Sequence, residues 1–317
     1  TDRLINSIRR NLLQQGIDIS RDKIYLFLNF DGIEEYDPLL EFVKVYGAHK
    51  PTGFIEHLAD CLHTATGEGI WPDYTFEIIR KVLVSTFSMH FDAKPSEYCL
   101  VLAGPKYIGK TSYISQLFPK ELVPYYNKVA FNEGKDFEMA VCQNLWILDD
   151  ELSGTAQTEY FKRIVSADHV FIRKNYDIYA EKLQRRSVFF GCTNNREFIR
   201  DSNNRRILPI WLDDRVNFTL YNSISKEMAW AEAYGLYLSG FDPSLTVDEV
   251  EKLKLISHDF EKSTLEFDLL KQRFVKPTDI YNDVEWLPHG EILSRLNESN
   301  NRELSSRQLT RAIERLI

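Results

Sequence analysis

The chain has 317 residues, of which 44% are hydrophobic, so it can bury a sizeable core and hold about two or three domains. A formal net charge of −8 excludes a uniformly basic coat for nucleic acid, and any DNA contact therefore requires a local basic surface. No apolar run approaches the roughly 18–20 residues that span a bilayer, and the N-terminal segment lacks a secretory core. We expect a cytoplasmic protein without a membrane partner, whose four cysteines are reduced core residues: Cys61, Cys99, Cys142 and Cys192.

The predicted elements divide the chain into four regions. Residues 1–92 have helical apolar spacing in LINSIRRNLLQQG and TFEIIRKVLVSTFSMHF. Residues 93–215 contain the short apolar runs YCLVLA, NLWILDD, SVFFGCT and RRILPIWL, which predict an α/β domain whose sheet is covered on both faces. Residues 216–275 read as helical, and residues 276–317 as two short helices. Because the chain starts at Thr1 and stops abruptly at Ile317, we expect it to be a fragment of a longer protein.

The segment GPKYIGKT fits the pattern GxxxxGK[ST] of a phosphate-binding P-loop, with a strand pattern before it and a helix pattern after it. We expect Lys110 to reach the β- and γ-phosphates of a nucleotide and the Thr111 hydroxyl to bind Mg²⁺. The alternative is a glycine-rich turn with an exposed lysine. The predicted nucleotide-binding residues are Gly104, Pro105, Lys106, Tyr107, Ile108, Gly109, Lys110, Thr111 and Ser112.

Three carboxylates end the next apolar strand, NLWILDDEL. Adjacent carboxylates repel one another without a cation, so this strand end is typical of a site that holds Mg²⁺ and activates water. We assign Asp150 to the metal and Glu151 to the general base, with Asp149 as the alternative metal ligand. A solvated acidic turn is the alternative interpretation.

The run SVFFGCTN ends in Asn194, whose amide suits a sensor of the γ-phosphate or of the attacking water. An arginine cluster follows, and its members are Arg196, Arg200, Arg205 and Arg206. We expect Arg205 or Arg206 to act as an arginine finger on the nucleotide of a neighbouring subunit. Each of them is alternatively an ordinary surface arginine.

The order of GPKYIGKT, WILDDEL and IRKNYDIYAEKLQRRSVFFGCTNNREFIRDSNNRRILPIW resembles the virulence-associated protein E family of phages and mobile elements, over roughly residues 36–212. The resemblance implies a P-loop NTPase core of the AAA+ type, similar to superfamily 3 helicases, that uses ATP and Mg²⁺. It also implies a ring-shaped homo-oligomer, such as a hexamer, acting on single-stranded DNA. The chain departs from the family where a Pro-Tyr-Gly is often found, because Asn175, Tyr176 and Asp177 stand there.

The resemblance also gives a role to the segment before SVFFGCTN. In superfamily 3 helicases a hairpin at this place grips single-stranded DNA, and a basic and aromatic tip suits contacts that tolerate any base sequence. The residues that would make these contacts are Arg173, Lys174, Tyr176 and Lys182. A solvated hairpin without a DNA contact is the alternative.

The C-terminal segments HGEILSRLNE and SSRQLTRAIERLI resemble a helix-turn-helix, and we interpret them as a winged helix whose wing is missing. Arginines recur every four residues on the outer face of the second helix, at Arg307, Arg311 and Arg315. We expect this basic stripe to contact duplex DNA. The alternative is a small packing domain.

These predictions together favour an ATPase, a hydrolase that couples ATP turnover to DNA unwinding or remodelling, as a helicase does in replication of a phage or mobile element. One alternative is an ATP-dependent DNA-binding switch that does not translocate. A P-loop kinase is the other alternative, but no acceptor site is apparent in the sequence, and three adjacent carboxylates suit the activation of water better.

Overall fold

The computed structural model describes residues 2–28, 36–50, 52–152, 158–173, 180–200, 205–274, 285–298, 303–314 and 316. The chain divides into two compact units, Thr1–Lys44 and Val45–Ile317. The first unit contains the helices α1 (Asp2–Gln14) and α2 (Arg21–Leu28), each of which buries a single isoleucine. The helix α3 (Pro38–Tyr46) crosses the boundary between the units.

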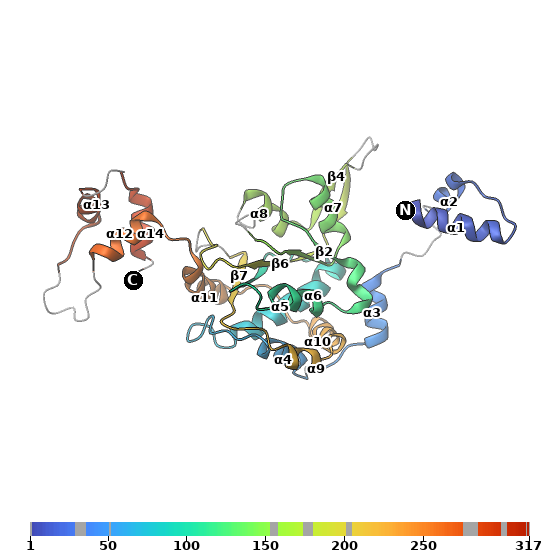
Figure 1. Ribbon diagram of the computed structural model, residues 1–317, viewed down its shortest axis with the longest axis horizontal. Helices are drawn as coiled ribbons and strands as arrows, with labels where there is room; N and C mark the ends of the chain where they lie inside the picture. The colour runs from blue at the N-terminus through green and yellow to red at the C-terminus, as the bar shows by residue number, and fades with distance from the viewer. Residues whose placement is uncertain are drawn as a thin grey trace. The chain divides into compact units, whose positions relative to one another are not determined.

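A five-stranded parallel sheet is the centre of the second unit (Figure 1). The strand order is β2-β3-β6-β1-β7, and every neighbouring pair is parallel. All residues of β1, β3 and β6 are buried, as expected for a sheet with helices on both faces. The predicted α/β class is therefore confirmed. The strands are β1 (Cys99–Ala103), β2 (Tyr126–Lys128), β3 (Trp146–Asp149), β6 (Val188–Thr193) and β7 (Ile207–Trp211).

Aromatic side chains fill the space on both faces of this sheet, because neighbouring residues of a strand point to opposite faces. On one face, Phe189 of β6 packs against Phe161 with ring centroids 5.3 Å apart. On the other face, Phe190 packs against Trp146 at 4.2 Å, and Trp146 against Trp230 at 5.3 Å. Figure 1 shows α7 (Lys135–Gln143) and α8 (Glu159–Ser166) on one side, and α5 (Tyr74–Asp92) and α10 (Lys226–Leu238) on the other.

Shorter helices complete the second unit. None of the helices among the described residues is both long and apolar enough to cross a membrane. The four cysteines are free and buried, as the sequence predicts. The remaining helices near the sheet are α4 (Phe54–Asp60), α6 (Lys110–Leu117), α9 (Phe218–Ser223) and α11 (Val247–Ser257), with short 3-10 turns η1 (Lys120–Tyr125) and η3 (His258–Phe260).

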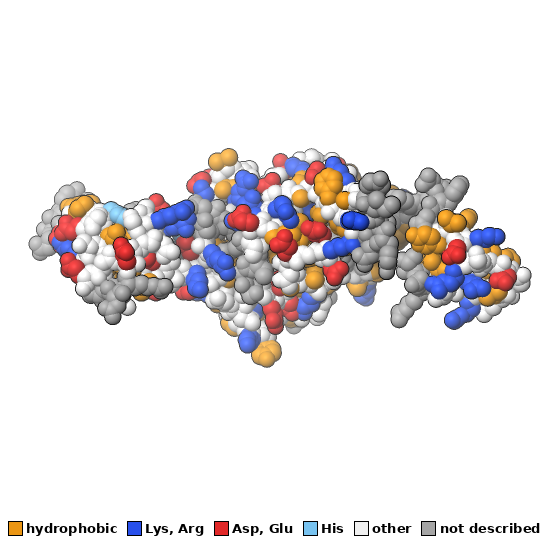
Figure 2. Space-filling view, turned by 90° about the horizontal axis from the view of Figure 1, so that it is seen from above, with side chains coloured by type: hydrophobic (Ala, Val, Ile, Leu, Met, Phe, Trp, Pro, Cys, Tyr) orange, Lys and Arg blue, Asp and Glu red, His pale blue; other side chains and the backbone are white. Residues whose placement is uncertain are grey.

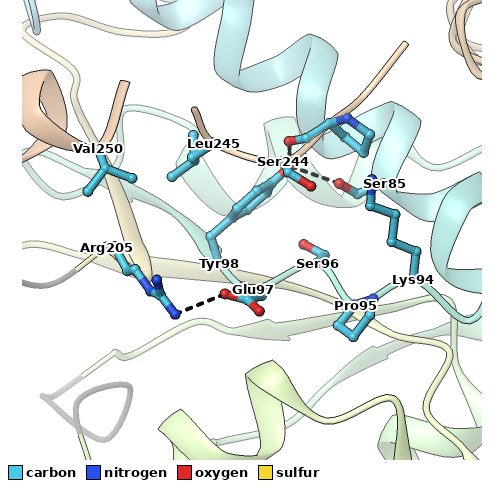
Figure 3. Close-up of a pocket in the computed structure, with 11 residues that line it drawn as sticks. Ser85, Lys94, Pro95, Ser96, Glu97, Tyr98, Arg205, Ser244, Leu245 and Val250 are labelled. Atoms are coloured by element: carbon cyan, nitrogen blue, oxygen red, sulfur yellow. Dashed lines mark hydrogen bonds and ion pairs between the residues drawn. The ribbon is translucent and has the colours of Figure 1, made fainter. Parts of the chain in front are cut away.

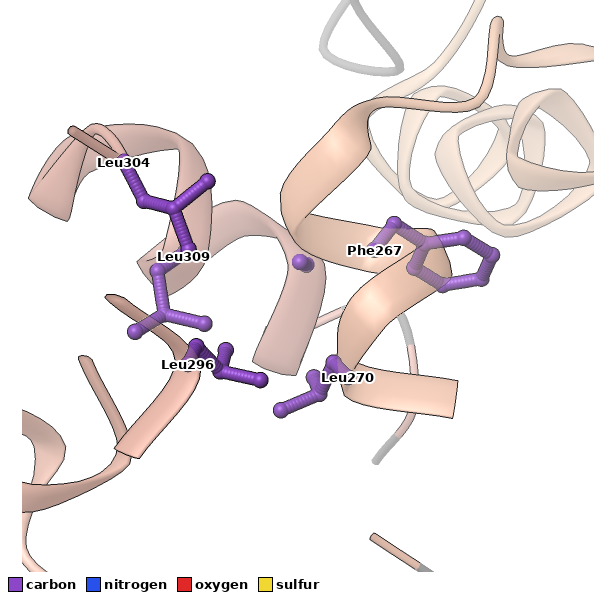
Figure 4. Packing of buried hydrophobic residues seen from close by; sticks show 6 residues of the cluster. Phe267, Leu270, Leu296, Leu304 and Leu309 are labelled. Atoms are coloured by element: carbon purple, nitrogen blue, oxygen red, sulfur yellow. The ribbon is translucent and has the colours of Figure 1, made fainter. Parts of the chain in front are cut away.

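Three C-terminal helices form a small core of their own (Figure 4). They are α12 (Leu265–Arg273), α13 (His289–Asn297) and α14 (Ser306–Glu314). The two helices expected in this part of the chain are present, and α12 packs against both of them through Phe267 and Leu270. The other buried members of the cluster are Leu296, Leu304, Leu309 and Ala312.

An antiparallel hairpin lies between α8 and β6 in the sequence, where the resemblance places a DNA-gripping hairpin. Its strands are β4 (His169–Ile172) and β5 (Glu181–Gln184), which pair from His169 opposite Gln184 to Ile172 opposite Glu181. The hairpin itself is therefore observed. Lys174 and Tyr176, which were expected at its tip, lie outside the described residues.

Arg185 joins this hairpin to the sheet. Its guanidinium is fully buried and donates to four backbone carbonyl groups. Two acceptors, Val165 and Ala167, lie at the end of α8, whereas Ser96 precedes β1 and Ser187 precedes β6. Burial lowers the pKa of Arg185 to about 9. The carbonyl groups compensate for the cost of burying this cation, so one side chain fixes the base of the hairpin against two central strands.

We predict that Arg185→Met lowers the free energy of unfolding by about 3 kcal/mol or more, because several buried carbonyl groups lose their donor. Urea denaturation followed by circular dichroism measures this loss. The half-buried neighbour Arg186 provides the control, and Arg186→Met should cost less than about 1 kcal/mol. Equal losses in the two variants would show that Arg185 has no special structural role.

Candidate functional site

The loop between β1 and α6 lies at the carboxyl edge of the sheet, where the inner strand β1 ends. Both glycines of the loop occupy backbone conformations that favour glycine, with φ of 150° at Gly104 and 100° at Gly109. A Cβ at Gly104 would lie 2.7 Å from the carbonyl oxygen of Leu212, and one at Gly109 would lie 2.5 Å from the ring of Phe218. The loop therefore requires glycine at these two positions for space as well as for backbone geometry.

Lys110 begins α6, and its ammonium group is directed back into the loop. The side chain is buried, and Nζ donates to the carbonyl oxygens of Gly104 and Pro105 at 2.8 and 2.6 Å. A third bond, of 2.9 Å, reaches Oδ1 of Asn194 at the end of β6. Burial lowers the pKa of Lys110. The predicted phosphate-binding lysine and the predicted sensor amide are thus in direct contact, and all three acceptors of the ammonium are uncharged.

Asp150 and Thr111 meet beside this lysine. The Thr111 hydroxyl donates to Oδ1 of Asp150, and the ammonium of Lys128 binds Oδ2 of the same carboxylate. Partial burial opposes ionisation of Asp150, but the hydrogen bonds from Lys128 and Thr111 outweigh it and lower the pKa of this carboxyl group. Lys128 ends β2 and was not predicted as a site residue, because β2 has three residues and no apolar pattern that marks it as a strand.

Asp149, the alternative metal ligand, faces away from Thr111. Its carboxylate is buried and accepts the backbone N–H of Phe131 at 3.1 Å and that of Glu151 at 3.2 Å. Successive residues at a strand end point to opposite sides, so only one of the two aspartates can face the loop. The structure brings Asp150 to Thr111, whereas Asp149 accepts from the backbone of its own strand end and of the segment at Phe131.

A cleft with a volume of about 400 Å³ opens over these groups, within the size range of small-molecule sites. Glu151 is exposed at its rim and also lines an adjoining cavity of about 560 Å³. Tyr107 adopts the left-handed conformation with φ of 65° and is 91% exposed; such strain in a bulky residue is concentrated at functional sites. The remaining lining residues of the cleft are Lys106, Gly109, Lys110, Thr111, Ser112, Asp150, Cys192 and Asn194.

The arginine cluster is divided between the two edges of the sheet. Arg205 and Arg206 precede β7 and therefore lie at the amino edge, opposite the cleft. Arg205 forms an ion pair of 3.3 Å with Glu97. Arg200 lines the cavity that adjoins the cleft, and Arg196 lies over the ring of Trp211 at 5.2 Å. The spacing of the four arginines in the sequence does not say at which edge of the sheet each one lies, so their division between the edges was not predicted.

None of the described residues predicted to contact DNA lines the cleft. Arg173 and Lys182 are exposed on the hairpin, and Arg307 and Arg311 are exposed on α14. Arg315 lies outside the described residues. In the described part of the chain, two predicted basic residues on each of these elements are therefore exposed to solvent.

The comparison with protein-family models confirms the family resemblance. A family model described as the virulence-associated protein E-like domain matches residues 55–262. A search of curated proteins found no match. Three solved structures of the NrS-1 C terminal region are similar at 13%, 14% and 12% identity, with TM-scores of 0.45, 0.43 and 0.43. They match 71%, 71% and 72% of this chain, and the chain spans about half the length of those structures, 54%, 54% and 57%.

The two aspartates should differ in their effect on stability. Asp149→Ala should lower the free energy of unfolding by about 2–3 kcal/mol, because a buried N–H at Phe131 loses its acceptor. Asp150→Ala should cost less than about 1 kcal/mol, since Asp150 and Lys128 are both partly exposed. Guanidinium denaturation of both variants measures the difference. A larger loss in Asp150→Ala than in Asp149→Ala would contradict these roles.

Proposed function

We propose a function for this chain, which belongs to the virulence-associated protein E-like family. It hydrolyses ATP with Mg²⁺ to unwind or remodel DNA in replication of a phage or mobile element. The observation that carries this proposal is the meeting of Lys110, Thr111, Asp150 and Asn194 at the carboxyl edge of a parallel sheet. In open α/β sheets, ligands bind outside the carboxyl ends of the strands.

The surroundings of Lys110 fit a nucleotide phosphate. The first N–H groups of α6 have no partner inside the helix, and the helix dipole favours an anion there. In the structure, the Lys110 ammonium donates to two neutral carbonyl oxygens of the loop. Bonds from an ammonium to charged phosphate oxygens are roughly twice as strong as bonds between neutral groups. A triphosphate would therefore be a better partner for Lys110 than the loop itself.

The Thr111 hydroxyl and the Asp150 carboxylate are the oxygen donors that Mg²⁺ prefers. They already share a hydrogen bond, and the ammonium of Lys128 forms an ion pair with the same carboxylate. When bound, Mg²⁺ neutralises charge on the β- and γ-phosphate oxygens. The donor set therefore fits this ion, with Asp150 in preference to Asp149.

Two further residues supply the hydrolytic step in this proposal. Glu151 extends from the strand end into the rim of the cleft, where its carboxylate can accept a proton from the attacking water. The Asn194 amide lies against Lys110 and can orient the same water or a γ-phosphate oxygen. Both follow neighbouring parallel strands, β3 and β6, and therefore lie at the same edge of the sheet.

Arg205 supports an assembly of several copies. It precedes β7, and the loop with Gly104 follows β1, the parallel partner of β7. Five residues of strand, about 16 Å, therefore separate the two ends. Arg205 is too far from the cleft of its own chain to act there, so a role as arginine finger requires a neighbouring copy in a ring.

The DNA contacts belong to local basic positions in this proposal. On the face shown in Figure 2, acidic and basic side chains lie intermixed. Arg173 and Lys182 on the hairpin suit a contact with the backbone of single-stranded DNA. The hairpin is anchored by Arg185 to the strands that lead to Lys110 and Asn194, so a change at the cleft has a rigid connection to the DNA contact.

ATP hydrolysis and strand displacement, measured with single-stranded and forked DNA, test the proposed function. A helicase should show hydrolysis stimulated by single-stranded DNA and displacement of the annealed strand. Stimulation without displacement would favour a switch that does not translocate. Transfer of phosphate to an acceptor other than water would favour a kinase.

Lys110→Ala should abolish ATP turnover, because the loop loses the cation that binds the phosphates. A phosphate-release assay with and without single-stranded DNA measures the loss. Lys120→Ala, which removes an exposed lysine at the start of η1, is the matched control and should retain full turnover. Near-normal hydrolysis by Lys110→Ala would refute the assignment of the loop.

Mixtures of Lys110→Ala and Arg205→Ala subunits should regain part of the activity that each variant lacks alone. In a mixed ring, an intact Arg205 of one copy can face an intact Lys110 site of the next. The measurement is the hydrolysis rate as a function of the mixing ratio, with Arg196→Ala in place of Arg205→Ala as the control. No recovery at any ratio, together with full hydrolysis by an isolated monomer, would contradict a finger acting between copies.

A further inference from the structure

A cavity separate from the cleft and from its adjoining cavity lies at the amino edge of the sheet (Figure 3). Its volume is about 270 Å³, and its walls come from α5, the segment before β1, the residue Arg205 before β7, and the first turn of α11 with the segment that precedes it. Pro243, Leu245 and Val250 form an apolar wall. Arg205 and Glu97 face one another on the opposite side, as Figure 3 shows.

The backbone on both sides of this ion pair is fixed. Before Glu97, the buried Ser96 accepts a hydrogen bond from Arg185 at its carbonyl oxygen. After it, the buried Tyr98 hydroxyl bonds to Ser85 at 2.8 Å and to the carbonyl oxygen of Pro243 at 3.0 Å. The carbonyl oxygen of Arg206 accepts the N–H of Cys99 at 2.7 Å, which ties the start of β7 to β1.

The side chains of the pair are less constrained than their backbone. Arg205 is 55% exposed and Glu97 is 50% exposed, and a single nitrogen, Nη2, makes the 3.3 Å contact. Exposed pairs of this kind contribute at most about 1 kcal/mol. The adjoining cavity leaves the guanidinium room to move, so the pair can open without a change in the backbone.

We propose that Glu97 is a positioning residue that holds Arg205 against its own chain until the phosphate of a nucleotide on a neighbouring copy competes for the guanidinium. This inference rests on the proposed function. The guanidinium cannot stay beside Glu97 and reach a nucleotide on a neighbouring copy at the same time, so the two anions compete for it. A phosphate carries more charge than Glu97 and can bind the guanidinium in bidentate fashion, so it is the stronger partner for Arg205. Arg205 can reach such a phosphate only on a second copy, and the pair with Glu97 therefore persists until that copy is in place.

The size of the effect follows from the exposed pair. Opening an ion pair worth about 1 kcal/mol changes the population of the free arginine by roughly fivefold. The Arg205–Glu97 pair therefore lowers ATP turnover by unassembled chains but does not prevent turnover in an assembled ring. High salt screens the pair and should reduce its effect.

The test compares ATP hydrolysis per subunit by wild type and Glu97→Gln, with single-stranded DNA present and the protein concentration below that for half-maximal activity. Glu97→Gln should raise the rate by up to about fivefold, and the gain should shrink as ionic strength rises. Asp242→Asn is the matched control, because it removes the carboxylate that pairs with Lys94 at 2.8 Å on the same cavity. It should leave the rate unchanged.

The double variant Arg205→Ala with Glu97→Gln completes a double-mutant cycle. It should hydrolyse ATP no faster than Arg205→Ala alone. A gain from Glu97→Gln that persists without Arg205 would overturn the inference, as would equal rates in wild type and Glu97→Gln. If Arg205→Ala lowers the rate in those cases, the finger remains and only the role of Glu97 fails. Unchanged hydrolysis in Lys110→Ala would instead overturn the proposed function itself.

Discussion

The hydrogen bonds of the Lys110 ammonium are the interaction on which the arrangement of the carboxyl edge of the sheet depends. It joins the loop after β1, through Gly104 and Pro105, to Asn194 at the end of β6. This contact exists because β1 and β6 are parallel and in register from Cys99 to Ala103, so that both strands end at the same level. A buried cation is costly unless its donors are satisfied, and here the ammonium has three oxygen acceptors.

The parallel sheet also separates two chemical tasks. The carboxyl edge gathers the groups proposed to bind phosphate and metal, whereas the amino edge holds Arg205 in its pair with Glu97. A length of strand lies between the edges, so a single chain cannot unite them. In the proposed function, an arginine finger at Arg205 therefore has to come from a neighbouring copy.

Much of the fold and the centre of the site could be predicted from the sequence, because apolar runs ending in Gly104, Asp149 and Asn194 are strong local signals. The choice between Asp149 and Asp150 depends on which side of a strand end faces the loop, and no local pattern encodes it. Lys128 was missed because its strand has three residues. Arg185 was missed because three of its four backbone acceptors are distant in sequence.

Binding of a non-hydrolysable ATP analogue to the wild-type chain, measured by titration calorimetry with and without Mg²⁺, tests the central claim most directly. The arrangement of Lys110, Thr111 and Asp150 predicts one nucleotide per chain and tighter binding in the presence of Mg²⁺. Absence of binding, or an affinity that does not depend on Mg²⁺, would contradict the assignment of this cleft as a site for a metal nucleotide.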